Sequence, residues 1–88
     1  MSIILDGNKM VDKASTHNYL RARLDIPGYF GNNLDALWDA LSTYDREMII
    51  ELKNKDCLVN NLGTYGISLI DLFTDAANGN QRIKFSII

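Results

Sequence analysis

The sequence predicts an α/β domain in which a three-stranded parallel sheet is packed by three to four helices. Three short apolar stretches, at residues 2–5, 48–52 and 83–88, have the length and composition of strands. Amphipathic stretches separate them, and strands that alternate with helices favour parallel pairing. The 88 residues suffice for a single domain, 1–88, with one modest core.

The first predicted strand ends at Asp6-Gly7, a typical turn sequence. A helix is expected from about Lys13 to Leu24, beginning near Asp12. Its apolar face includes His17, which we expect to be a hydrogen-bonded core residue because no second metal ligand lies nearby in the sequence.

The helix expected from Leu34 to about Ser42 is the clearest element, because Asn33 is a good N-cap. Its apolar residues recur at helical spacing: Leu34, Leu37, Trp38 and Leu41. A short helix is expected at 55–62. Another is expected from Tyr65 to Ala77, with Asn78-Gly79 as its C-cap. The side chains expected inward on this last helix are Ile67, Leu69, Ile70, Leu72, Phe73, Ala76 and Ala77.

Charge is segregated along the chain. Residues 24–45 and 65–81 hold six aspartates and no Lys or Arg, whereas the rest holds five acids and nine bases. The first set therefore carries −6 and the second +4. Such acidic segments favour a basic protein partner and disfavour nucleic-acid binding, which requires clustered Lys and Arg.

A reducing, cytoplasmic location is expected from the cysteine content. Cys57 has no second cysteine to pair with, and we expect it to be a small buried or half-buried residue. No stretch has the length and apolarity of a signal peptide or a membrane-spanning helix.

Paired aspartates lie on both long amphipathic helices. Asp35 and Asp39 are four residues apart, so their carboxylates point the same way, and Asp71 and Asp75 repeat this spacing. Like charges so placed slightly destabilise a helix. Folding therefore gives no reason for Asp39, but a basic partner would.

Aromatic side chains flank the first acidic helix. Tyr29 and Tyr44 are expected at an interface, where tyrosine is enriched, and Phe30 is expected in the core. Gly31 would let a partner approach the backbone closely.

The run Tyr-Phe-Gly-Asn-Asn-Leu-Asp-Ala-Leu-Trp-Asp-Ala-Leu at 29–41 closely resembles the signature of the barstar family, intracellular inhibitors of barnase-type ribonucleases. Weaker similarity covers the whole chain. The resemblance implies a barstar-like fold and a stoichiometric, 1:1 inhibitor of a secreted ribonuclease, without cofactor or metal, whose acidic helix mimics RNA phosphates in the active site.

By the same resemblance, Asp39 is the central phosphate mimic, Asp35 pairs with a nuclease arginine, and Tyr29 packs on the catalytic histidine. The remaining implied contacts are Gly31, Asn33, Ala36, Trp38, Tyr44 and Asp75. The best-known member differs at four positions, with Trp in place of Tyr44, Glu in place of Asp75, an apolar residue in place of Asp45 and an acidic residue in place of Asn32. These differences are expected to affect which nuclease is bound and with what affinity, and to affect the mode of binding less.

Three alternatives remain open from the sequence. The chain could be an immunity or antitoxin protein for a different basic toxin, or a regulatory binding domain that has lost nuclease binding. It could also be an enzyme that uses Asp35 and Asp39 as metal ligands or as an acid/base pair. The single histidine and the lack of a phosphate-binding glycine loop argue against the enzyme.

Overall fold

A computed structural model describes residues 2–29 and 31–88. The expectation that Phe30 packs in the core lies outside these residues. The strands β1 (Ser2–Asp6), β2 (Met48–Lys53) and β3 (Ile83–Ile87) form one parallel sheet in the order β1-β2-β3. The predicted three-stranded parallel sheet is therefore confirmed.

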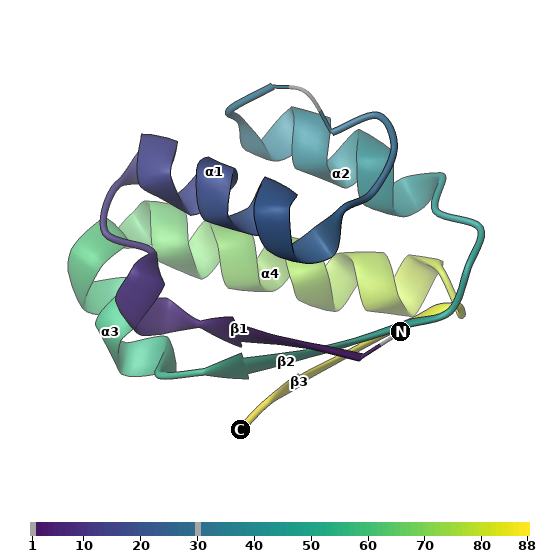
Figure 1. Cartoon of the computed structure of the whole chain (residues 1–88). Coiled ribbons are helices and arrows are strands. Elements are labelled where there is room, and N and C mark those ends of the chain that lie inside the picture. Colours follow the sequence, from purple (N-terminus) through teal and green to yellow (C-terminus); the bar gives the residue numbers. More distant parts are fainter. Residues whose placement is uncertain (1, 30) are drawn as a thin grey trace.

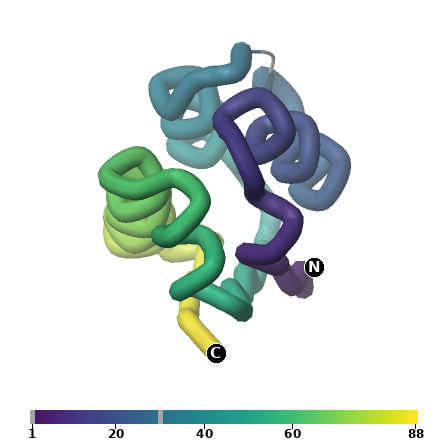
Figure 2. The backbone as a smooth tube through the Cα atoms, turned by 90° about the vertical axis from the view of Figure 1, so that its left-hand side faces the viewer, coloured from purple at the N-terminus to yellow at the C-terminus, as the bar shows by residue number. Residues whose placement is uncertain are grey.

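In the part of the chain that the structure describes, four α-helices connect the strands. They are α1 (Lys13–Leu24), α2 (Leu34–Ser42), α3 (Lys55–Leu62) and α4 (Thr64–Gly79), and a short 3₁₀ helix, η1 (Gly7–Lys9), follows β1. Helices α1, α2 and α4 lie on one side of the sheet, and α3 lies at the end of β2 (Figures 1 and 2). Because all three long helices cover the same face, the other face of the sheet is left open.

Buried and exposed side chains alternate along the strands, as expected for a sheet that is covered by helices on one face. In the parallel register Ile3 pairs with Ile50 and Leu5 with Leu52, and these four side chains are buried under the helices. Ile4 and Ile49 point the other way and are exposed. The core therefore lies between the sheet and α1, α2 and α4.

The last helix departs from the sequence prediction in two ways. Ile67 was expected inward, but 49% of its side chain is exposed, because it lies one turn before Asp71 on the polar side of α4. The helix also runs through Gly79, and its C-cap is Asn80, whose backbone N–H donates to the Ala76 carbonyl at 2.8 Å. The Asn80 side chain reaches the end of the α2 region and donates to two further carbonyls, those of Leu41 and Tyr44.

The expected state of Cys57 is confirmed, since the thiol is free and half-buried. Over the described ranges 2–29 and 31–88, no helix combines the length and apolarity needed to cross a membrane.

Candidate partner-binding surface

The first turn of α2 is fixed by its N-cap. The Asn33 side-chain oxygen accepts a hydrogen bond from the Ala36 backbone N–H at 2.8 Å, as the sequence predicted. Burial of Leu37 and Leu41 then fixes the rotation of the helix about its axis. Asp35 and Asp39 lie away from this buried side and are exposed. The carboxylate pair is thus presented to solvent by a helix whose position is set by the core.

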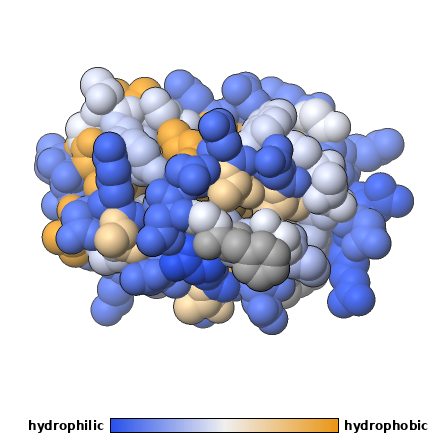
Figure 3. Space-filling model, turned by 90° about the horizontal axis from the view of Figure 1, so that it is seen from above, coloured by the Kyte–Doolittle hydropathy of each residue, from blue (hydrophilic) through white to orange (hydrophobic). Residues whose placement is uncertain are grey.

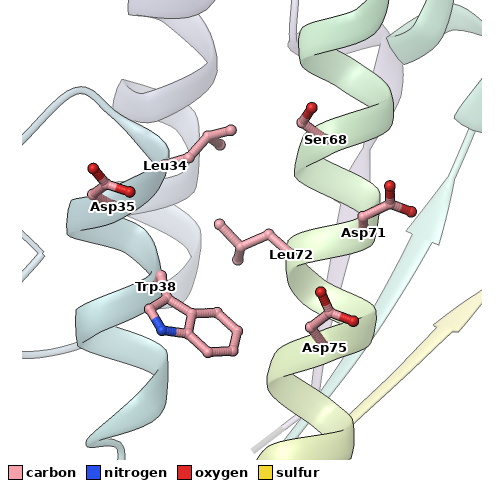
Figure 4. Close-up of a pocket in the computed structure, with 7 residues that line it drawn as sticks. All are labelled: Leu34, Asp35, Trp38, Ser68, Asp71, Leu72 and Asp75. Atoms are coloured by element: carbon pink, nitrogen blue, oxygen red, sulfur yellow. The ribbon is translucent and has the colours of Figure 1, made fainter.

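A groove of about 340 Å³ separates α2 from α4. In the close-up, Trp38 from α2 and Leu72 from α4 project into the space between the two helices (Figure 4). Trp38 is 41% exposed, so part of its indole is accessible from the groove although the residue belongs to the apolar stripe of α2. The residues that line the groove are Leu34, Asp35, Trp38, Ser68, Asp71, Leu72 and Asp75.

Carboxylates lie on both sides of this groove. Asp35 comes from α2, and Asp71 and Asp75 come from α4. Within the described part of the chain, no Lys or Arg forms an ion pair with these three residues or with Asp39. Unneutralised carboxylates around a half-exposed indole make the groove suited to a cationic side chain, which can pair with the acids and stack on the ring.

Tyr44 lies on the other side of α2. It is half-buried and, with Asp45, lines a hollow of about 200 Å³ that also includes Pro27, Ala40 and Thr43. The structure therefore separates two predicted contacts: Trp38 belongs to the interhelical groove, and Tyr44 to the hollow at the end of the helix.

The loop before α2 packs closely on that helix at Gly31. A methyl group added at this glycine would lie 3.1 Å from the Ala36 side chain and 3.1 Å from the Asn33 amide nitrogen. The Gly31 carbonyl accepts a hydrogen bond from Arg21 of α1 at 3.4 Å, and Arg21 also donates to the Asn32 side chain. Gly31, Asn33 and Ala36 therefore form one compact unit at the start of α2.

Tyr29 points into the molecule. Only 3% of its side chain is exposed, and its hydroxyl group is hydrogen-bonded to Nδ1 of His17. Burial raises the pKa of the Tyr29 hydroxyl, so this group stays protonated. Little of the side chain is available for direct contact with a partner, which the sequence pattern did not indicate.

His17 is fully buried and hydrogen-bonded, which confirms the sequence prediction for this residue. Its Nε2 atom lies 2.6 Å from the Tyr65 hydroxyl oxygen of α4. Removal from water lowers the pKa of the imidazole, and the nearby positive charge of Arg21 lowers it further. The ring is therefore neutral at neutral pH.

Sequence reasoning missed the contribution of Arg21 and Tyr65. Arg21 lies one helical turn after His17, a spacing that places both on one side of α1 and could have indicated a shared role. No local signal connects Tyr65 with His17. Among the residues that the structure describes, no cluster of His, Cys, Asp and Glu could hold a metal ion.

The family described as "Barstar (barnase inhibitor)" matches the chain over residues 1–88. A Bacillus subtilis (strain 168) protein named "Putative ribonuclease inhibitor YrdF" is 36% identical over 87 residues, which cover 98% of this chain and 94% of that protein. Both matches extend over the sheet and all four helices.

Proposed function

This chain belongs to the barstar family, and we propose that it blocks the active site of a barnase-type ribonuclease with the acidic face of α2. Family membership and the similarity to the B. subtilis protein support the role of a ribonuclease inhibitor, and not that of an enzyme. We propose the contact residues, the barnase-type target and the 1:1 stoichiometry on the grounds of the exposed acidic surface.

The observation that carries the proposal is the exposure of Asp35 and Asp39 on a capped helix with no ion-pair partner among the described residues. A ribonuclease active site is built to bind phosphates, so carboxylates at suitable spacing can occupy it in place of RNA. Asp39 is the central phosphate mimic, and Asp35 pairs with an arginine of the nuclease. The rigid start of α2, with Asn33 and Ala36, sets the direction in which both carboxylates point.

The groove next to α2 receives a second part of the nuclease surface. An arginine in it can stack on the half-exposed indole of Trp38 and pair with Asp75. Gly31 at the start of α2 and Tyr44 in the hollow at the end of the helix complete the contact surface. Tyr29, the least exposed of the proposed residues, contributes mainly by holding the segment before α2 in place.

Polar contacts dominate this proposed interface. The face that carries α1 and α2 is largely hydrophilic, with apolar side chains in small separate areas (Figure 3). Such a surface favours a charged partner that is attracted electrostatically over a partner bound through an extended apolar interface. A cytoplasmic inhibitor that neutralises a basic ribonuclease before its secretion fits this surface and the free thiol of Cys57.

The decisive test is a titration of RNA cleavage. A barnase-type ribonuclease is mixed with increasing amounts of the protein, and we expect cleavage to stop at a molar ratio of one. The matched control is the double variant Asp35→Asn, Asp39→Asn, which keeps side-chain size and removes both charges. Full cleavage at a large excess of the wild-type protein would contradict the proposal and would favour an immunity protein for a different basic toxin.

A further inference from the structure

We infer that Tyr65 is a positioning residue, which acts through His17 and Tyr29 to hold the loop before α2 in the conformation that binds the ribonuclease. The binding part of this inference rests on the proposed function. Its structural part, a hydrogen-bonded chain Tyr65–His17–Tyr29 with a fixed direction, can be tested on the free protein.

The hydrogen bonds between Tyr65 and His17 and between His17 and Tyr29 join three segments that are far apart in the sequence. Tyr65 lies in the first turn of α4, His17 in the middle of α1, and Tyr29 in the loop that leads into α2. The His17 ring meets both tyrosine rings edge to face, with centroid distances of 5.9 Å to Tyr29 and 6.0 Å to Tyr65. Through the buried His17 ring, Tyr29 is therefore connected to both α1 and α4.

The direction of the hydrogen bonds follows from burial. Tyr29 is almost fully buried, and its only hydrogen-bond partner among the described residues is Nδ1 of His17. If Nδ1 carried the proton, the Tyr29 hydroxyl proton would have no acceptor, which is costly in a buried site. Tyr29 therefore donates to Nδ1, and Nε2–H donates to Tyr65. Tyr65 is half-buried, so its own hydroxyl proton can reach water.

Loss of the Tyr65 hydroxyl leaves the imidazole without a satisfactory state. With the proton still on Nε2, a buried N–H lacks an acceptor. With the proton moved to Nδ1, the Tyr29 hydroxyl must turn to accept, and its proton is left unbonded in the core. In both cases the hydrogen bond between His17 and Tyr29 is weakened, although the substituted residue, Tyr65, lies on α4.

Arg21 of α1 makes further contacts with the segment before α2, in addition to the His17–Tyr29 hydrogen bond. Arg21 lies over the Tyr29 ring, 5.7 Å from its centroid, and donates to the Gly31 carbonyl. The loop between Tyr29 and the helix cap Asn33 is short, so a shift of Tyr29 moves the start of α2. A loosened loop spends less time in the binding conformation, and the apparent affinity falls in proportion.

The experiment compares Tyr65→Phe with Tyr19→Phe. Tyr19 is a matched control, because its hydroxyl also makes one cross-segment hydrogen bond, from the Asp6 backbone N–H at 2.9 Å, but to β1 and not to the loop. We expect Tyr65→Phe to bind a barnase-type ribonuclease about tenfold more weakly, as loss of one buried hydrogen bond implies. Tyr19→Phe should bind as the wild type does. In the free protein, amide hydrogen exchange at Ala36 and Leu37, whose N–H groups donate to Asn33 at the start of α2, should be faster only in Tyr65→Phe.

Nitrogen-15 NMR of the wild-type imidazole provides a spectroscopic signature that needs no variant. We expect His17 to carry its proton on Nε2, and a proton on Nδ1 would overturn the inferred direction. Equal losses of affinity in both tyrosine variants, or unchanged exchange at Ala36 and Leu37 in Tyr65→Phe, would overturn the positioning role. If the wild type binds no ribonuclease, the proposed function fails, but the exchange and NMR results still decide the structural part.

Discussion

Nε2 of His17 lies 2.6 Å from the hydroxyl oxygen of Tyr65, although 48 positions separate the two residues in the sequence. This hydrogen bond connects α1 with the first turn of α4, and the other ring nitrogen of His17 bonds Tyr29 in the loop before α2. A buried, neutral imidazole thus lies at the meeting point of three segments. Its protonation state must affect the stability of the fold.

We expect stability to fall as the pH is lowered through about 6.5. Burial lowers the pKa of folded His17 below its ordinary value of 6.5, with a further contribution from Arg21. The unfolded chain therefore takes up this proton more readily than the folded chain. The contribution is fully present above pH 6.5 and is lost progressively toward the lower folded pKa. Urea unfolding between about pH 5.5 and 7.5 measures the slope.

The control for this prediction is His17→Gln. The variant is expected to be less stable at every pH, but its stability should be nearly independent of pH over the same range. The low pKa values of Asp6 and Asp12 affect stability only at much more acidic pH, since both titrate below 3.8. The same pH slope in the wild type and in His17→Gln would show that another group is responsible.

Removal of both carboxylates from α2 should leave the fold intact. We expect the double variant Asp35→Ala, Asp39→Ala to unfold within about 0.5 kcal/mol of the wild type, or to be slightly more stable, because it relieves a like-charge pair on an exposed face. Asn33→Ala serves as the contrast on the same helix, since loss of the N-cap costs about 1 kcal/mol. A loss of more than about 2 kcal/mol in the double variant would mean that these aspartates serve the fold.

Asp39→Ala should weaken ribonuclease binding more than any other single substitution. Truncation leaves the partner's cations buried and unpaired, a cost of roughly 2–5 kcal/mol that appears chiefly as faster dissociation. Asp75→Ala is the comparison, because Asp75 lies on α4 at the side of the groove and should cost less. Surface plasmon resonance separates the two rate constants. Equal affinities for the two variants, or wild-type binding by Asp39→Asn, would rule out phosphate mimicry.

Association with a basic ribonuclease should slow markedly as salt is added. The acidic segments, 24–45 and 65–81, supply both walls of the groove and the exposed face of α2, so the partner approaches a surface of one sign. Screening shortens the range of this attraction to about 8 Å at physiological ionic strength. Stopped-flow association rates at low and high salt measure the effect, and a rate constant independent of salt would contradict electrostatic steering.

The sequence by itself determined the secondary structure and the main features of α2. The strands, the boundaries of α1 and the N-cap Asn33 all lie where periodicity and capping residues predicted them, and the short helix at 55–62 is present as α3. The exposure of the Asp35–Asp39 pair also follows from spacing alone. These features depend on interactions within one or two helical turns, which a sequence pattern records directly.

Only the tertiary structure decided how the segments combine. It brought Trp38 and Asp75 to the same groove and turned Tyr29 inward to His17. It also left Ile67 on the polar side of α4, where the sequence had predicted an inward side chain. These outcomes depend on the packing of helices against a common sheet and on hydrogen bonds between residues such as His17 and Tyr65. Such contacts join positions too far apart for any local pattern to specify, because their geometry exists only once the core has formed.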